Sequence, residues 1–131
     1  MSTSVLQRVE HVLHDYLNGI HNGDVELLKQ VMHPECRMIS VSESKHMNIG
    51  MAEYFNVVAN RQSPREVCEE RTDLIRSIDR VSDELVSARL RCRVLGKDCE
   101  DQLTLVNTDG RWQIISKVFA FKSVGAVVAA E

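Results

Sequence analysis

The 131-residue chain has no apolar run near the roughly 20 residues that a membrane-spanning helix needs. It has no basic excess either, since 16 Lys and Arg stand against 19 Asp and Glu, for a formal net charge of -3. Nucleic-acid-binding domains usually show a basic face. Residues 1–4 do not form a basic segment followed by an apolar stretch. We therefore expect no membrane partner, no nucleic-acid partner, no secretory signal and a cytoplasmic location.

Paired metal ligands at short spacing are also missing. The four cysteines form no CxxC pair, and the five histidines form no HxxxH or HExxH pattern. A structural zinc site needs such pairs. We expect reduced and mostly buried thiols, no metal site and no cofactor. The cysteines are Cys36, Cys68, Cys92 and Cys99.

The composition is that of one globular domain. Hydrophobic residues make up 44% of the chain and charged residues 27%, which is ordinary for a folded protein of this size. No repeat, low-complexity segment or linker divides the sequence. We expect a single domain over residues 1–131, with residues 124–131 as a flexible tail.

Helical spacing of apolar residues dominates the first half of the chain. It predicts a helix over 4–21, opened by a capping box of Ser4 and Gln7 and ended by Asn22-Gly23. A second helix is expected over 24–32, because Asp24 is a good cap and Pro34 stops the helix. A third is expected over 49–61, capped by Asn48, with an inner side formed by Met51, Phe55 and Val58.

Strands are expected between and after these helices. Residues 35–41 alternate enough to form one, and a short strand can follow near His46. From residue 66 onward the period changes to two. Gly96-Lys97 and Asp109-Gly110 are plausible tight turns. The pattern therefore predicts an antiparallel sheet with one covered face, built from strands at 66–81, 86–94, 98–107 and 111–121.

The two turns set a register that places polar residues. With Gly96-Lys97 as the turn, Cys92 faces Asp101, and Asp101 lies on the covered, apolar side with Leu103 and Leu105. A carboxylate there is costly unless it is paired, hydrogen-bonded or protonated. The back of the sheet mixes charged and apolar residues, which suits a homodimer interface. Its expected members include Arg91, Gln102, Thr104, Ile115 and Lys117.

The order of helices and strands resembles the nuclear transport factor 2-like superfamily, and within it the SnoaL-like and putative lumazine-binding-like group. The carrying segments are "YLNGIHNGDVELLKQVMHP" at 16–34, "SIDRVSDELVSARLRCRV" at 77–94 and "DQLTLVNTDGRWQIISKVF" at 101–119. The resemblance implies an α+β, cone-shaped fold of three N-terminal helices packed on a strongly curved, mainly antiparallel sheet. It also implies a pocket at the wide end of the cone and a homodimer.

Within this superfamily, ketosteroid isomerases carry a tyrosine eight residues before a Gly-Asp aspartate, and Tyr16 and Asp24 have that spacing. Those enzymes also carry a protonated aspartate on a late strand. Asp101 resembles it in position. The resemblance thus implies an oxyanion hole of Tyr16 and Asp101. The position of the isomerases' base falls on Ser40, which cannot take a carbon acid's proton unaided, so His33 is the candidate base.

Two functions stay open from the sequence. One is a pocket protein for a carbonyl-containing small molecule, in which proton transfer would make it an isomerase, cyclase or lyase. The other is a non-catalytic dimeric binding or interaction module. Candidate catalytic residues are Tyr16, Asp101 and His33. Each also has a structural reading: a core tyrosine, a satisfied aspartate and a helix-end histidine. Candidate ligand contacts are Trp112, Ser40, Ser116 and Phe55.

Overall fold

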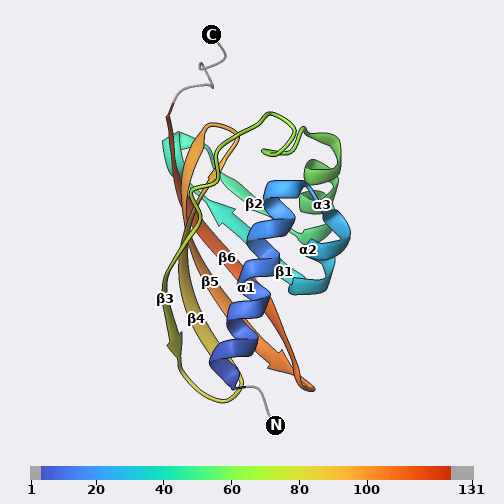
Figure 1. The fold of residues 1–131 in the computed structure, drawn as a ribbon, viewed down its shortest axis with the longest axis vertical. Coiled ribbons are helices and arrows are strands. Elements are labelled where there is room, and N and C mark those ends of the chain that lie inside the picture. The colour runs from blue at the N-terminus through green and yellow to red at the C-terminus, as the bar shows by residue number, and fades with distance from the viewer. Residues whose placement is uncertain (1–3, 125–131) are drawn as a thin grey trace.

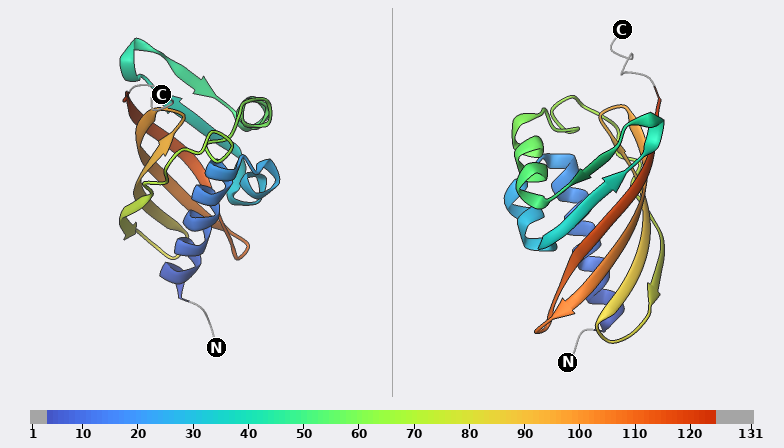
Figure 2. Two further views of the ribbon diagram at one scale, coloured as in Figure 1. Left: turned by 45° about the horizontal axis from the view of Figure 1, so that its top comes forward. Right: turned by 180° about the vertical axis from the view of Figure 1, so that it is seen from behind.

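The structure is a computed structural model and describes residues 4–124. Three helices and a short 3-10 turn accompany a six-stranded sheet, and all three helices lie on one face of it (Figure 1). Seen from behind, no helix covers the other face (Figure 2). The expected α+β class, with three helices on a mainly antiparallel sheet, is confirmed. The predicted tail at 124–131 lies, apart from Val124, outside the described residues.

Capping side chains and a glycine set the ends of two of the three helices. Helix α1, Val5–Asn22, opens with the predicted capping box of Ser4 and Gln7, and Gly23 ends it in the left-handed conformation at φ 66°. Helix α2, Val25–Val31, is capped by the side chain of Asp24. Helix α3, Met51–Asn60, follows Gly50 without a side-chain cap, so the prediction of Asn48 as its cap is wrong. Asn48 instead lies in a strand and accepts hydrogen bonds from Arg37.

The sheet has the strand order β2-β1-β6-β5-β4-β3, with one parallel pair, β1 and β6, among antiparallel neighbours. That pair brings the first strand beside the last, although the two are far apart in the sequence. The strands are β1 Met32–Ser40, β2 Met47–Ile49, β3 Leu74–Arg80, β4 Leu85–Val94, β5 Lys97–Thr108 and β6 Arg111–Ser123.

Two predicted boundaries are wrong. Helix α2 ends at Val31, and β1 starts at Met32, so Pro34 lies inside the strand rather than stopping the helix. The long strand expected at 66–81 is only β3, because residues 61–73 form turns and loop. Part of this loop is tied to the sheet by Glu69, whose carboxylate accepts hydrogen bonds from the backbone of the β4–β5 turn.

The β4–β5 turn lies one residue earlier than predicted, and the side chains of β5 keep their predicted faces. The turn residues are Leu95 and Gly96, both at positive φ, which suits a tight hairpin. Cys92 therefore pairs with Cys99 instead of Asp101, and Asp101 pairs with Leu90. Moving the turn by one residue shifts the pairing partner by two, and side chains alternate with period two, so the predicted inner face of β5 is retained.

A bulge in β6, by contrast, reverses which of its side chains face the helices. Leu105 pairs with Ile114 as predicted, but Thr104 pairs with Ser116, which leaves Ile115 as an extra residue. Beyond Ile115, every side chain of β6 is therefore turned over. Lys117 was predicted on the outer face and instead is 5% exposed on the helix side, whereas Val118 is on the outer face and 45% exposed.

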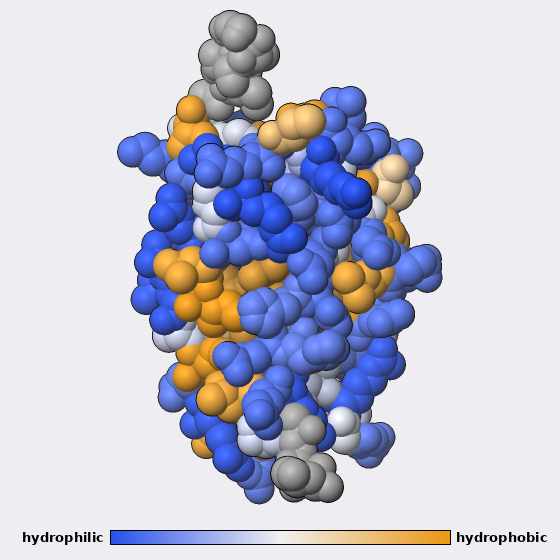
Figure 3. Space-filling view, viewed as in Figure 1, coloured by the Kyte–Doolittle hydropathy of each residue, from blue (hydrophilic) through white to orange (hydrophobic). Residues whose placement is uncertain are grey.

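The core lies between α1 and the inner face of β4, β5 and β6. On the face seen in Figure 3, apolar surface gathers between β3 and α1, and hydrophilic side chains cover most of the rest. No helix within residues 4–124 is long and apolar enough to cross a membrane.

Candidate functional site

A cavity of about 170 Å³ opens at the end of the sheet near α3 and the β4–β5 turn. Its walls come from the ends of α1 and α3, from β1 and β2, and from β4, β5 and β6. The inner wall is mostly apolar and aromatic, while basic side chains surround the rest. The lining residues are Ile20, Met38, Lys45, His46, Met47, Tyr54, Arg61, Val94, Leu95, Lys97, Cys99, Lys117, Phe119 and Phe121.

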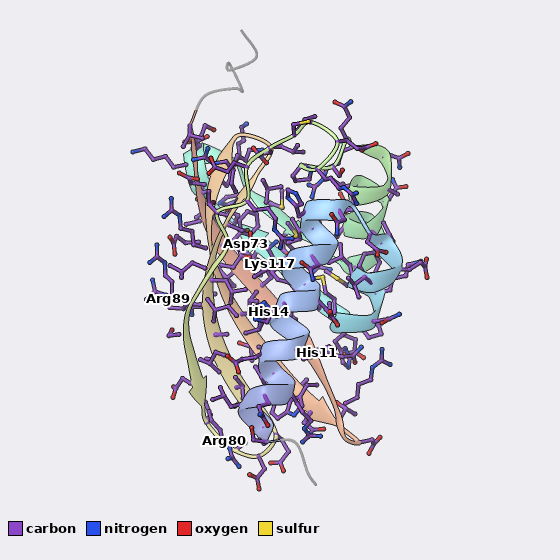
Figure 4. All side chains as sticks on the ribbon, in the orientation of Figure 1. His11, His14, Asp73, Arg80, Arg89 and Lys117 are labelled. Carbon is purple, nitrogen blue, oxygen red and sulfur yellow. The ribbon has the colours of Figure 1, made fainter. Side chains whose placement is uncertain are left out.

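Lys117 is the buried cation of this cavity. It comes from β6 and lies on the side of the sheet that α1 covers (Figure 4). Its ammonium lies 5.5 Å from the ring centroid of Tyr54 and 5.0 Å from that of Phe119, and both rings line the cavity. Within residues 4–124, no group accepts a hydrogen bond from this ammonium. A buried ammonium whose nearest described contacts are ring faces still has N–H groups that can donate hydrogen bonds to a ligand.

Tyr16 and Asp101 form a hydrogen-bonded pair beside Lys117. The hydroxyl of Tyr16 donates to Oδ2 of Asp101 at 2.5 Å, and both side chains are buried. The ring of Tyr16 also lies 5.3 Å from the ammonium of Lys117. The second carboxylate oxygen of Asp101, Oδ1, is buried and has no hydrogen-bond partner in the described chain. Asp101 is therefore an incompletely satisfied buried acid with a buried cation nearby.

The electrostatics of the three groups are linked. Burial alone lowers the pKa of Lys117, but the negative charge of Asp101, with smaller contributions from Tyr54, Cys92 and Cys99, raises it above its ordinary value. Burial is the main cause that raises the pKa of Tyr16, and the charge of Asp101 adds to it. At neutral pH Lys117 is thus a cation and Tyr16 a neutral donor. Lys117 can stabilise a negative oxygen and cannot act as a base.

The predicted catalytic residues do not all meet at the cavity. Tyr16 and Asp101 contact one another but lie behind the lining. His33 contacts neither of them and does not line the cavity. Its Nδ1 accepts a hydrogen bond from the backbone N–H of Glu35. The histidine at the cavity is His46, from the segment before β2.

The predicted ligand contacts lie elsewhere. Trp112 lines a separate hollow between the start of α1 and the β5–β6 turn. Phe55 is half-buried and packs against Tyr54, and it does not line the cavity. Ser40 is buried, and its hydroxyl accepts a hydrogen bond from the backbone of Ser42. Ser116 lies at the bulge, on the outer side with Val118.

Sequence reasoning missed Lys117 and Tyr54. In α3 the buried positions are Met51, Tyr54 and Val58, and the i, i+3, i+7 spacing of these three was available in the sequence. For Lys117, the signal was the alternation of large Phe119 and Phe121 with smaller neighbours in β6, which favours an inward face for the odd positions. Among the described residues, no group of three or more His, Cys, Asp or Glu could hold a metal ion.

The chain is similar in fold to several solved structures. It is similar to a nuclear transport factor 2-like protein of unknown function from Silicibacter pomeroyi DSS-3, with a TM-score of 0.81, 17% identity, and 93% of this chain and 100% of that chain covered. A nuclear transport factor 2-like protein of unknown function from Shewanella baltica OS155 has a TM-score of 0.79 and 22% identity, and 92% of this chain and 98% of that chain are covered. The fold is therefore that of the nuclear transport factor 2-like superfamily.

One similar structure is a ketosteroid isomerase-like protein from Erwinia carotovora atroseptica SCRI1043, with a TM-score of 0.71, 13% identity, and 93% and 99% of the two chains covered. At these identities the likeness extends to the fold alone. No curated protein matches the chain. The profile of the family described as "Putative lumazine-binding" matches residues 4–120, and the chain belongs to that family.

Proposed function

We propose that the protein binds a small carbonyl-containing or phenolic molecule in the cavity and that Lys117 holds the oxygen of this ligand. The observation that carries the proposal is a lysine, 5% exposed, whose ammonium faces the cavity without a hydrogen-bond acceptor in the described chain. A buried cation with unused donors favours a partially negative oxygen. The description of the family, "Putative lumazine-binding", names a small molecule, which supports a small-molecule ligand.

The chemistry that this arrangement suits is proton transfer next to the carbonyl. As a proton leaves the neighbouring carbon, negative charge develops on the oxygen, and a fixed cation in a closed site stabilises it. The base must be another group, and we propose His46, which also lines the cavity. Tyr16 and Asp101 act here as positioning residues that do not line the cavity: the charge of Asp101 favours the charged form of Lys117, and Tyr16 donates a hydrogen bond to Asp101.

Blocking the cavity tests the proposal without touching a charge. Met47, half-buried on β2, lines the cavity, and Met47→Trp places a bulky ring in its mouth. We expect this variant to weaken binding of 4-nitrophenolate at least about tenfold, because the ring occupies the volume that the ligand needs. Val41→Trp is the matched control, since Val41 is 63% exposed and does not line the cavity. Equal affinity of both variants by calorimetric titration contradicts the proposal.

We also propose that the protein acts as a homodimer through the outer face of the sheet. Val118 and Leu74 are 45% and 47% exposed on this face, among arginines, which suits a mixed interface of roughly 800 Å² per partner. Lys117, which the sequence placed in this interface, is no part of it. The four thiols, all unpaired, support the further proposal of a cytoplasmic location.

Sedimentation tests the dimer. We expect the wild type to sediment as a dimer at micromolar concentration and Val118→Glu to shift it toward monomer, because the interface would have to desolvate a charge where it now buries an apolar side chain. Val57→Glu introduces the same charge at an exposed position of α3, on the helix side of the sheet, and is expected to leave the dimer intact. A wild-type monomer at these concentrations counts decisively against the interface.

A further inference from the structure

The lining of the cavity carries positive charge with no carboxylate residue among its members. Lys45, from the segment between the 3-10 turn and β2, Arg61, which follows α3, and Lys97, at the start of β5, accompany Lys117. The whole chain has a net charge of -3, so this gathering of cations is local and does not follow from composition. Clefts lined by one sign of charge attract the opposite one.

Two carboxylates on segments next to this lining, Glu43 and Glu69, are held by other partners. Glu43 accepts hydrogen bonds from the backbone and hydroxyl of Ser123 at 2.9 and 2.8 Å, and the backbone bond is the main cause that lowers its pKa. Glu69 accepts from the backbone of Leu95 and Gly96 at 2.6 and 2.7 Å. Within residues 4–124, neither forms an ion pair with a cation of the cavity. The charge of Asp101 acts on Lys117, and that of Glu43 acts on Lys45 and Lys97, but none of these pairs is in direct contact in the described residues, so the donors of these cations are left for a ligand.

Two of the cations that accompany Lys117 in the lining, Arg61 and Lys97, also have geometry that suits a ligand. Nε of Arg61 is buried and has no hydrogen-bond partner in the described part of the chain. The ammonium of Lys97 lies 5.2 Å from the ring centroid of Phe121, another lining residue. The cavity therefore has one buried cation, Lys117, a wall of apolar and aromatic side chains, and further unpaired donors around it.

Building on the proposed function, we propose that the ligand is a small organic carboxylic acid. Its flat or conjugated body fills the apolar part of the cavity, its carbonyl or phenolic oxygen reaches Lys117, and its carboxylate lies among Lys45, Arg61 and Lys97. The volume of about 170 Å³ is below the roughly 300–1,000 Å³ of pockets for drug-sized ligands, so a single ring is the expected size. Charge-assisted hydrogen bonds to the carboxylate select the acid over neutral analogues.

Two probes of nearly equal shape test the carboxylate. 4-Hydroxybenzoate and 4-hydroxybenzamide share the ring and the phenolic oxygen and differ in charge at the other end. We expect the wild type to bind the acid about tenfold more tightly, since several partly exposed ion pairs of modest strength add up to that ratio. The triple variant Lys45→Gln, Arg61→Gln and Lys97→Gln should bring the ratio of the two affinities close to one while the amide keeps its affinity.

The controls separate this inference from the proposed function. Arg89→Gln removes a cation from the outer face and should leave the ratio unchanged, and circular dichroism melts check that every variant is folded. Lys117→Met should weaken both probes. If acid and amide bind the wild type equally while Lys117→Met weakens both, the carboxylate inference is overturned and the proposed function stands. If Lys117→Met changes neither affinity, the proposed function fails. Binding of neither probe overturns the inference, and 4-nitrophenolate then tests the function separately.

Discussion

Replacing Lys117 with methionine is expected to weaken the binding of 4-nitrophenolate roughly 10- to 100-fold. A hydrogen bond to a charged group contributes about 1.5–3 kcal/mol, and 1.4 kcal/mol corresponds to a factor of ten. Methionine keeps the length and apolar body of the side chain, so the aromatic surroundings of Tyr16, Tyr54 and Phe119 remain filled. The loss therefore reports the ammonium and not the shape of the cavity.

The measurement is an equilibrium titration of wild type and variant with the same probe. Lys122→Met is the matched control, since it changes the same residue type at an exposed position of β6 that does not line the cavity. An unchanged affinity in Lys117→Met, with a folded variant and an intact control, means that the ligand oxygen does not contact this lysine.

Replacing Asp101 with asparagine is expected to destabilise the fold by about 3 kcal/mol, the second large effect. Removing one member of a buried charge pair leaves the other uncompensated, and such losses measure roughly 3–5 kcal/mol. Asparagine can still accept the hydrogen bond from Tyr16, so the variant isolates the charge. Denaturant unfolding of wild type, Asp101→Asn, Lys117→Met and the double variant measures the coupling between the two residues.

The double variant should recover most of the stability that Asp101→Asn loses, because no unpaired charge then remains. Glu100→Gln, on the neighbouring residue of β5, breaks an exposed pair with Arg76 and should cost less than about 1 kcal/mol. Additive losses in the double variant contradict an interaction between Asp101 and Lys117.

The pH dependence of the Asp101 effect has a definite sign. The folded-state pKa of Lys117 is raised, so the stabilisation from its charge is fully present below the unfolded value of roughly 10.4. That stabilisation is lost as the pH rises through the folded-state value. The difference in stability between wild type and Asp101→Asn should therefore be constant near neutral pH and shrink at strongly alkaline pH.

Two independent periodicities in the sequence predicted that Tyr16 and Asp101 both lie between the helices and the sheet. Tyr16 lies on the apolar stripe of α1, and Asp101 lies on the apolar side of β5, so each had to face the other's element. The prediction survived a wrong turn at Gly96-Lys97 because the true turn, one residue earlier, shifts the pairing by two residues, and period two restores the face. Local pattern was therefore sufficient for these two residues.

The position of Lys117 could not be read the same way. The period-two register from the Asp109-Gly110 turn is correct up to Ile114, and the extra residue Ile115 then reverses it. A bulge inserts one residue and keeps period two on either side of it, so only the large side chains of Phe119 and Phe121 signal the reversed face. For that reason the sequence pointed to Tyr16 and Asp101 as the ligand-facing groups, whereas the structure places Lys117 at the cavity and the other two behind it.

Optical titration of bound 4-nitrophenol tests most directly whether Lys117 presents a positive charge to a ligand in the cavity. The phenol and the phenolate absorb at different wavelengths, so the protonation state of the bound probe is read from its spectrum. A facing cation lowers the pKa of the bound phenol below its value in water, whereas an apolar cavity alone raises it. We predict a lowered pKa in the wild type and a raised one in Lys117→Met. A probe bound to the wild type as the neutral phenol, or with the same pKa in both proteins, contradicts the account.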